Sequence, residues 1–208
     1  MTTSFGIVII GDEILSGKRA DKHLPKFIEL LGARGLQLSF ADYVGDDPDR
    51  ITATLARAFE GARRSGDVVF SCGGIGATPD DHTRQCAAKA LGVELELHPE
   101  AKVLITERMK DTAKEQGVPF DPDRHDNIHR LNMGVFPVGA EIITNPYNKI
   151  PGFTCRAGAG AVHFVPGFPV MAWPMMEAVL GEQYKHLHRT EAYVEKSVIV
   201  FGSMEATL

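Results

Sequence analysis

The sequence predicts an α/β fold in which a parallel sheet is covered by helices on both faces, and three observations predict it. Strand-like and helix-like stretches alternate along the first two-thirds of the chain, a pattern typical of parallel strands joined by helical crossovers. Loops rich in glycine and carboxylates follow the strand-like stretches. The 208 residues, of which 44% are hydrophobic and 24% charged, suit a protein with its own apolar core.

The first elements follow from short apolar runs and from helical spacing. FGIVII (residues 5–10) is rich in β-branched residues and predicts a strand that ends at Gly11. Apolar side chains in residues 24–31 recur at i, i+3, i+4 and i+7, which predicts a helix. LQLSFADYV (36–44) predicts the second strand, and apolar positions between residues 51 and 62 mark one face of the second helix.

The glycine loop lies between a strand and a helix. DVVFS (67–71) predicts the third strand, and HTRQCAAKALG (82–92) predicts the helix that follows the loop. PEAKVLITERMKDTAKEQG (99–117) predicts a further helix, and VPFDPDRHD (118–126) reads as irregular chain.

The last third has a looser pattern. Residues 140–144 and 161–165 predict strands, separated by the Pro- and Gly-rich stretch NKIPGFTCRAGAG. Residues 168–184 predict a final helix, and 191–201 a last strand. We therefore expect one α/β domain over residues 1–208, with a C-terminal elaboration from about residue 140.

Charge and composition exclude several classes of partner. The net charge is −5, and no basic run exceeds a pair, so nucleic acid is not expected as a partner. The start of the chain lacks a basic segment, and its apolar run is too short for a signal peptide or a membrane span. The three cysteines are odd in number and show no CxxC spacing, so we expect a reducing cytoplasm and no membrane.

Three loops at strand ends carry the functional prediction. They span residues 11–17, 45–48 and 72–81, and each contains glycine and carboxylates. Ligands of open α/β sheets bind beyond the carboxyl ends of the strands. We therefore expect these loops to form one site.

The stretch GGIGATPDD suits an anion. Gly73, Gly74 and Gly76 can adopt positive φ and present unobstructed N–H groups, and the following helix adds its positive end. Neither a GxxxxGK[ST] nor a GxGxxG motif is present. The standard ATPase and dinucleotide-binding interpretations therefore lose support.

The carboxylates of this stretch admit two interpretations. Asp80 or Asp81 could cap the following helix, with Thr83 in its first turn. Alternatively, a Mg²⁺ ion could lie between carboxylates and phosphates and turn repulsion into a bridge. We expect a cap for one aspartate and the metal for the other. Asp12 and Glu13 are further metal candidates, or else a charged turn at a helix start.

Several motifs in order resemble a known family. IIGDEILSGK, VGDD, GGIGATPDDHT, NPYNKIPGF and VPGFPVM resemble the molybdopterin-binding domain superfamily, with most likeness to the N-terminal domain of the competence/damage-inducible protein A family. The resemblance covers nearly the whole chain. It implies a three-layer α/β sandwich with a mainly parallel sheet, assembled as a homo-oligomer (dimer or trimer).

The resemblance also implies functional residues. It places Mg²⁺ and catalysis on Asp46 and Asp81, and Asp80 is a further metal candidate from the loop itself. The residues implied in ligand binding are Gly11, Asp12, Gly73, Gly74, Gly76, Thr78, Thr83, Pro151 and Gly152. The chain departs from the family pattern at Cys72, Ala77 and Lys149, where threonine, proline and a small residue are usual. It departs again at Asp21-Lys22-His23, where the pattern usually continues to an asparagine after an aspartate.

Three functions remain open from the sequence. The first is binding of a phosphorylated pterin or nucleotide, with molybdopterin as a possible ligand, in molybdenum cofactor metabolism. The second, also implied by the resemblance, is a metal-dependent ADP-ribose pyrophosphatase, and a nucleotidyltransferase is the related enzymatic reading. The third is a non-catalytic subunit of an oligomer.

Other candidate residues have a structural reading beside the functional one. His125 and His129 resemble a metal pair, but we expect an exposed pair on a loop or short helix. Cys72 invites a nucleophile hypothesis, although a small residue at a strand end is the commoner explanation. Asn132 and Lys149 are possible ligand contacts, and the group around Met175 and Trp173 is expected in the core or at an interface.

Overall fold

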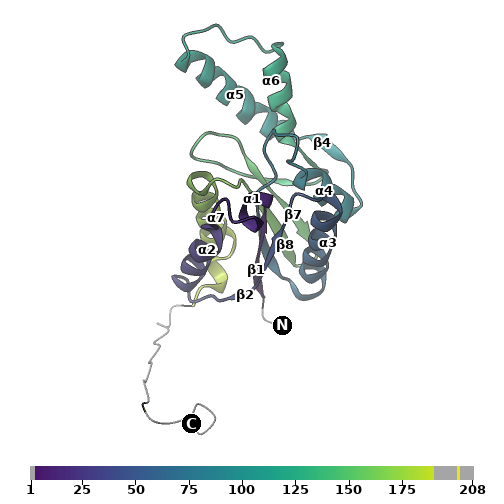
Figure 1. Cartoon of the computed structure of the whole chain (residues 1–208), viewed down its shortest axis with the longest axis vertical. Helices are drawn as coiled ribbons and strands as arrows, with labels where there is room; N and C mark the ends of the chain where they lie inside the picture. The colour runs from purple at the N-terminus through teal and green to yellow at the C-terminus, as the bar shows by residue number, and fades with distance from the viewer. Residues whose placement is uncertain (1–2, 190–200, 202–208) are drawn as a thin grey trace.

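The computed structural model describes residues 3–189 and 201, and a six-stranded sheet lies at its centre (Figure 1). The strand order is β2-β1-β3-β8-β7-β6. β1, β2, β3 and β8 are parallel, and β7 runs antiparallel to both of its neighbours. The predicted mainly parallel sheet is therefore confirmed. The strands are β1 (Phe5–Ile10), β2 (Leu38–Val44), β3 (Val68–Cys72), β6 (Glu141–Ile143), β7 (Gly152–Ala157) and β8 (Gly160–Val165).

Helices cover both faces of the sheet. They are α1 (Asp12–Leu15), α2 (His23–Gly32), α3 (Pro48–Ser65), α4 (Thr83–Leu91), α5 (Pro99–Glu115), α6 (His125–Arg130) and α7 (Pro169–Gln183). Figure 1 shows α2 and α7 on one side and α3 and α4 on the other, with α5 and α6 projecting beyond the carboxyl ends of the parallel strands. A small second sheet pairs β4 (Leu95–Leu97) with β5 (Val135–Pro137).

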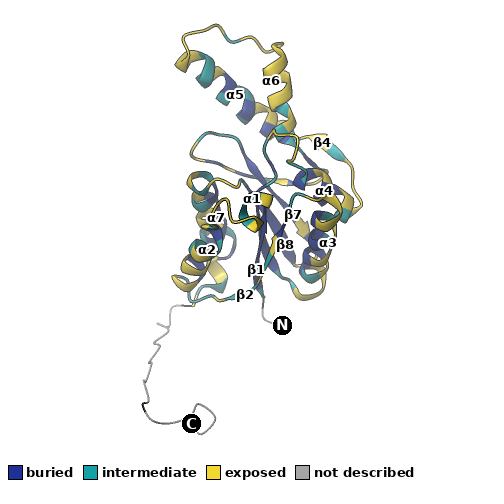
Figure 2. Ribbon diagram, in the orientation of Figure 1, coloured by how far each residue is buried: buried dark blue, intermediate teal, exposed yellow. Residues whose placement is uncertain are grey.

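The alternation of side chains along β1 explains the three layers. Val8 and Ile10 pack in the cluster that contains the inner faces of α3 and α4. Ile7 and Ile9 point the other way, into the cluster formed by α2 and α7. Because successive strand side chains face opposite sides, an all-apolar strand such as β1 needs cover on both. Figure 2 shows the buried residues concentrated in the strands and along the inner faces of the helices.

Helix boundaries follow local chemistry. Asp47 precedes α3, and its carboxylate accepts a hydrogen bond from the Arg50 amide at 2.8 Å, while Pro48 fills the first helical position. Gly66 ends α3 and Gly92 ends α4, both at a φ of 71°, the left-handed conformation that glycine adopts at low cost.

The structure adds elements that the sequence pattern does not reveal. β7 occupies residues that we interpreted as a connection, and β4, β5 and the short α1 were not predicted. Residues from about 140 on, where we expected a C-terminal elaboration, supply β6, β7 and β8 of the main sheet. The strand predicted at 191–201 lies outside the described residues, apart from Phe201. Within the described residues, no helix combines the length and apolarity needed to cross a bilayer.

Candidate functional site

The three predicted loops meet at the carboxyl ends of the parallel strands, where they surround a cavity of about 370 Å³. Gly11 follows β1, Asp46 follows β2, and Gly73 follows β3. A fourth side comes from the connection after β8, including Gly167 and Phe168. The volume lies within the range of about 300–1,000 Å³ that is usual for small-molecule sites.

The loops after β1 and β2 are joined by a reciprocal pair of hydrogen bonds. The Asp12 amide donates to Asp46 Oδ2 at 2.9 Å, and the Asp46 amide donates to Asp12 Oδ1 at 3.2 Å. The carboxylate of Asp47 is used as the cap of α3, so of the two adjacent aspartates only Asp46 lines the cavity.

Asp46 lies in an acidic environment. Partial burial raises the pKa of its carboxyl group above the usual value, and the negative charges of Asp12, Glu13 and Asp80 raise it further. The hydrogen bond from the Asp12 amide opposes this rise. A carboxylate held beside like charges gains most from a cation or a proton.

The glycine loop requires glycine for two reasons. Gly73 and Gly74 have φ values of 102° and 68°, which side chains other than glycine rarely adopt. A Cβ at Gly73 would also collide with the Ile10 carbonyl oxygen, and one at Gly74 with the Thr83 hydroxyl group. The loop is therefore both left-handed and closely packed on its neighbours.

The start of α4 binds the carbonyl groups of this loop. The Thr83 hydroxyl donates to the Gly73 carbonyl at 3.1 Å, and the Thr83 amide donates to the Gly74 carbonyl at 3.0 Å. The Arg84 guanidinium, only 5% exposed, donates to the carbonyls of Ile75 and, at 2.7 Å, Gly76. Four successive carbonyl groups thus point at two residues.

This anchoring fixes the direction of four amide groups. Every peptide bond in the described residues is trans, so each N–H points opposite to the carbonyl of the preceding residue. The N–H groups of residues 74–77 therefore point away from α4, and these residues line the cavity. Within the described chain none of these four groups donates a hydrogen bond. We call these four amides, of Gly74, Ile75, Gly76 and Ala77, the amide cradle.

The two aspartates after the cradle do not cap α4. The N-cap position is His82, without a side-chain cap, so the capping interpretation of Asp80 or Asp81 was wrong. Asp81 instead accepts hydrogen bonds from the Thr78 amide, at 2.8 Å, and from the Thr78 hydroxyl, and these contacts fold the loop back on itself. The helix α4 therefore begins at Thr83, one residue after its predicted start.

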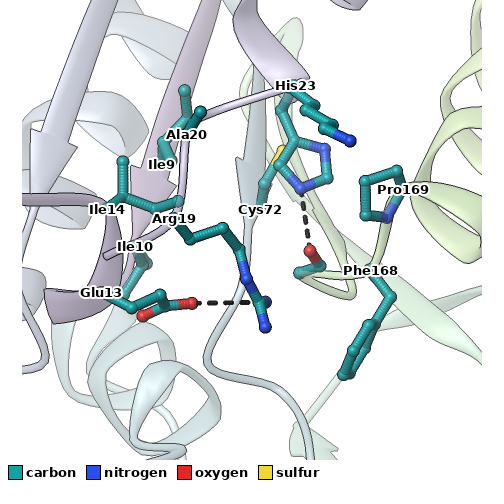
Figure 3. A pocket seen from close by; sticks show the side chains of 12 residues that line it. Ile9, Ile10, Glu13, Ile14, Arg19, Ala20, His23, Cys72, Phe168 and Pro169 are labelled. Carbon is teal, nitrogen blue, oxygen red and sulfur yellow. Dashed lines mark hydrogen bonds and ion pairs between the residues drawn. The ribbon is translucent and has the colours of Figure 1, made fainter. Parts of the chain in front are cut away.

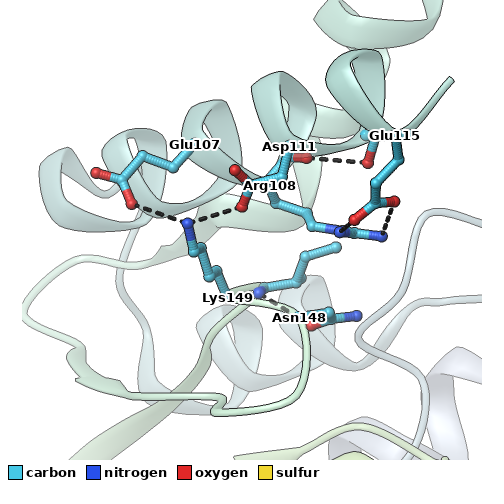
Figure 4. Close-up of polar contacts among 8 residues, drawn as sticks. Glu107, Arg108, Asp111, Glu115, Asn148 and Lys149 are labelled. Carbon is cyan, nitrogen blue, oxygen red and sulfur yellow. Dashed lines mark hydrogen bonds and ion pairs between the residues drawn. The ribbon is translucent and has the colours of Figure 1, made fainter. Parts of the chain in front are cut away.

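The connection between β6 and β7 forms another wall of the cavity through Asn148, Ile150 and Pro151. Asn145, buried under this connection, donates to Asn148 Oδ1 at 2.8 Å and to the Ile150 carbonyl at 2.9 Å. Lys149 adopts a φ of 64° and forms ion pairs with Asp111 at 2.7 Å and Glu107 at 3.6 Å on α5 (Figure 4). Lys149 is thus engaged with α5 and is not among the residues lining the cavity.

Most of the predicted site residues are brought together. Those that line the cavity are Gly11, Asp46, Gly73, Gly74, Gly76, Thr78, Asp80, Asp81 and Pro151. Asp12 and Thr83 act from behind it, through the hydrogen bonds described above. Gly152 is buried in β7, where a Cβ would collide with the Phe164 backbone.

The remaining candidates have structural explanations. Cys72 is 1% exposed, and burial raises the pKa of its thiol well above the usual value, which disfavours the thiolate that a nucleophile needs and favours the structural explanation. His125 and His129 are exposed on the short helix α6, as expected. Asn132 donates to His129 Nδ1 at 3.0 Å. In the part of the chain described, no group of three or more His, Cys, Asp or Glu side chains could hold a metal ion.

Sequence reasoning missed several residues of the site. Arg84 follows Thr83 directly in the motif, but a buried arginine that binds backbone carbonyls leaves no periodic signal. Met133, Phe168 and Met171 line the cavity from distant segments; the last two lie in the VPGFPVM motif, but neither was singled out as a site residue.

Several proteins are similar to this chain in sequence. A CinA-like protein of Anaeromyxobacter dehalogenans is 35% identical over 184 residues, covering 85% of this chain and 42% of the relative. The chain thus spans about two-fifths of the length of that protein. A protein of Pyrobaculum arsenaticum is 31% identical over 206 residues, covering 97% of this chain and 71% of the relative.

Solved structures agree on the fold. The crystal structure of CinA from Thermoplasma acidophilum, described as of unknown function, superimposes with a TM-score of 0.70 at 27% identity, covering 86% of this chain and 98% of that chain. The molybdopterin biosynthesis enzyme MoaB of Thermus thermophilus gives 0.54 at 20% identity, covering 89% and 96%, and shows the fold alone. Residues 6–186 match the family described as the probable molybdopterin binding domain, and the chain belongs to this family.

Proposed function

We propose that the protein binds a phosphorylated pterin or nucleotide, with a phosphate group in the amide cradle. The observation that carries the proposal is that the carbonyls preceding the four amides of residues 74–77 are tied to Thr83 and Arg84, while the N–H groups have no partner within the described chain. Such successive backbone donors are suited to an anion, because they need no reorganisation to receive it. The family match and its relation to molybdenum cofactor biosynthesis proteins support a pterin as one ligand class.

We further propose that Mg²⁺ is held jointly by the ligand and by one or two of the carboxylates of Asp46, Asp80 and Asp81. The raised pKa of Asp46 fits a carboxylate that gains from a cation. Mg²⁺ sites on phosphorylated ligands commonly use one or two carboxylates and complete their coordination with phosphate oxygens and water, so a set of three protein ligands is not required. When bound, the cation would neutralise the phosphate charge beside the carboxylates.

A thermal-shift panel tests this function. ADP-ribose, ATP, FAD and molybdopterin are each added with and without Mg²⁺. A ligand at about 100 times its dissociation constant should stabilise the fold by about 2.7 kcal/mol. We expect at least one compound to give such a shift, and we expect Mg²⁺ to enlarge it. In Asp46→Asn the increase caused by Mg²⁺ should be lost. No shift with any compound would contradict the proposal, and equal shifts with and without Mg²⁺ would remove the cation from it.

A second candidate function is metal-dependent hydrolysis of an ADP-ribose-like pyrophosphate. The carboxylates of Glu13, Asp46 and Asp80, which all line the cavity, favour it. Hydrolysis would add water across one P–O bond and yield two phosphomonoesters, with the cradle amides receiving the charge that develops on the phosphoryl oxygens. Chromatographic detection of AMP and ribose 5-phosphate from ADP-ribose would separate this enzyme from a binding protein.

We also propose that the protein assembles as a homo-oligomer, a dimer or trimer. This prediction is based on the resemblance of its motifs, and light scattering on the purified protein measures it. A mass equal to one chain of 22.7 kDa would remove it.

A further inference from the structure

The connection between β6 and β7, residues 144–151, is the basis of this inference, and we call it the β6–β7 wall. Lys149 lies among its cavity-lining residues but does not line the cavity itself. Figure 4 shows the Lys149 side chain reaching from the wall to α5, where its Nζ atom lies 2.7 Å from Asp111 Oδ2 and 3.6 Å from Glu107 Oε2. The wall is therefore attached to α5 on the side that faces away from the cavity.

The backbone of Lys149 is left-handed. Its φ is 64°, and no other residue except glycine has a positive φ in the described part of the chain. Side chains disfavour this conformation, so the surroundings must hold it in place. The Lys149 amide donates to the Asn145 carbonyl at 3.0 Å, which closes the turn. Glycine would adopt this conformation freely, so the presence of lysine points to a use of its side chain.

The helix α5 is a fixed support for the ion pairs. Its residues Ala101, Ile105 and Met109 are buried in the core. Glu107 and Asp111 lie four residues apart on the same helix, and like charges at this spacing repel each other. The ammonium group between them offsets the repulsion, so the ion pairs stabilise both α5 and the position of the wall.

Other hydrogen bonds of the wall run elsewhere. Those of the buried Asn145 side chain stay within the wall, and Asn148 donates to Met171 Sδ on α7 at 3.2 Å. Among the described residues, the polar contacts between the wall and α5 all come from Lys149. The contact with Asp111 raises the pKa of the Lys149 ammonium group and lowers the pKa of the Asp111 carboxyl group, so both groups stay charged at neutral pH.

We propose that Lys149 is a positioning residue, whose ion pairs latch the β6–β7 wall to α5 and keep the wall against a bound ligand. The inference rests on the proposed function, because the ligand is one whose phosphate lies in the amide cradle. The cradle and the wall line one cavity, so the part of a ligand that extends beyond its phosphate meets the wall. Without the latch those contacts weaken, whereas the cradle keeps its own hydrogen bonds with Thr83 and Arg84.

Titration of two probes tests this inference, followed by the amide chemical shifts of ¹⁵N-labelled protein. Inorganic phosphate fills the cradle alone, and AMP extends beyond it. Lys149→Met removes the charge and keeps the length of the side chain. It should weaken AMP binding about two- to fivefold, because exposed ion pairs contribute modestly, and leave phosphate binding unchanged. Lys149→Arg keeps the charge and should restore most of the AMP affinity.

Variants on α5 provide a control and a second route. Lys102→Met removes an exposed lysine that is not part of the latch, and it should alter neither affinity. Asp111→Asn breaks the 2.7 Å contact from the side of α5 and should weaken AMP binding even if Lys149→Met fails to fold. The double variant of Lys149→Met and Asp111→Asn should bind AMP no more weakly than Lys149→Met, because both changes break one contact.

Lys149→Gly separates positioning from a role in folding. Glycine removes the ion pairs but adopts a positive φ freely. The variant should therefore bind AMP at least as weakly as Lys149→Met without a lower melting temperature. A loss of AMP affinity that always accompanies a lower melting temperature would mean that Lys149 serves the fold alone.

The possible failures are distinguishable. A wild-type protein that binds neither probe contradicts the proposed function and this inference with it. If the wild type binds both probes and Lys149→Met binds AMP equally well, only the latch is contradicted. Equal weakening of both probes by Lys149→Met would assign its effect to the charge of the site, and the latch would again be wrong.

Discussion

At the scale of single residues, the site depends on a buried arginine whose role is to hold the backbone. Arg84 reaches under the glycine loop and donates to the Ile75 and Gly76 carbonyls. Its burial lowers the pKa of the guanidinium, and the Asp81 charge opposes this. The guanidinium thus holds the carbonyls of the loop in place and is not among the residues that line the cavity.

Replacing Arg84 should weaken phosphate binding through the backbone. In Arg84→Lys a single ammonium group cannot reproduce the fork that binds two carbonyls, so the amides of Gly76 and Ala77 lose their fixed direction. We expect ribose 5-phosphate affinity to fall at least about tenfold, with a loss of about 2–4 kcal/mol in the free energy of unfolding. Titration and urea unfolding measure the two effects.

Arg57→Lys, a change at an exposed position on α3, is the matched control and should affect neither property. Unchanged ligand affinity in a destabilised Arg84→Lys protein would show that Arg84 serves the fold alone.

The ionised carboxylate of Asp46 should lower the stability of the ligand-free protein, although it serves Mg²⁺-dependent binding. Its pKa is raised in the folded state, so its contribution to stability is greatest at acidic pH and is lost as the pH rises through that pKa. An asparagine at this position would resemble the protonated form and keep an oxygen for the Asp12 amide. We expect Asp46→Asn to stabilise the ligand-free protein at pH 7 by a few tenths of a kcal/mol to about 1 kcal/mol.

Melting curves at pH 7 and pH 3.5 measure this effect. The difference between Asp46→Asn and the wild type should disappear at the lower pH, and Mg²⁺-dependent ligand binding should be lost at pH 7. A variant that is less stable at pH 7 would mean that the carboxylate is satisfied in the fold and has no need of a cation.

At the scale of elements, the local sequence predicts well the helices and strands that carry their own pattern of apolar residues. β1 and β3 are apolar runs buried on both faces, and α3 has a clear apolar stripe and an Asp-Pro start. β7 pairs with β8 as a hairpin across residues 158–159, and it was missed because its sequence contains polar residues flanked by glycine. β4 and β5 are three-residue strands that only tertiary pairing stabilises.

Gly152 and Gly181 differ in what an added methyl group would meet, so alanine should have opposite effects on stability at the two positions. Gly152 lies in β7 against the Phe164 backbone and the Met175 methyl group, whereas Gly181 in α7 faces open space. Gly152→Ala should therefore destabilise the fold by about 1–3 kcal/mol. Gly181→Ala should stabilise it by about 0.5–1 kcal/mol, since alanine loses less entropy in a helix.

Urea unfolding of the two variants compares them directly. The pair also tests the position of β7 beside β8, on which the Asn148–Pro151 wall of the cavity depends. A Gly152→Ala protein as stable as the wild type would mean that β7 and β8 are not packed as described.

At the scale of the whole molecule, the site is a product of topology. The parallel strands β1, β2, β3 and β8 end at one edge of the sheet, so loops far apart in sequence meet there. This much follows from the sequence pattern, which is why the three loops could be predicted to converge. A second cavity, of about 240 Å³ (Figure 3), could not be predicted, because it needs α1, the start of α2 and the segment after β8 to be placed against one another.

The same topology leaves the proposed phosphate to the backbone, because the amides at the end of β3 suit any phosphate. α5 supports the wall formed by the β6–β7 connection through its ion pairs with Lys149 (Figure 4).

The most direct test of the account is a titration of ¹⁵N-labelled protein with ribose 5-phosphate, followed by amide chemical shifts. The account predicts that the proton resonances of Gly74, Ile75, Gly76 and Ala77 move downfield together, as hydrogen bonds to the phosphate form, and saturate with one dissociation constant. Shifts confined to residues outside this loop, or no saturable shift in it, would contradict the amide cradle.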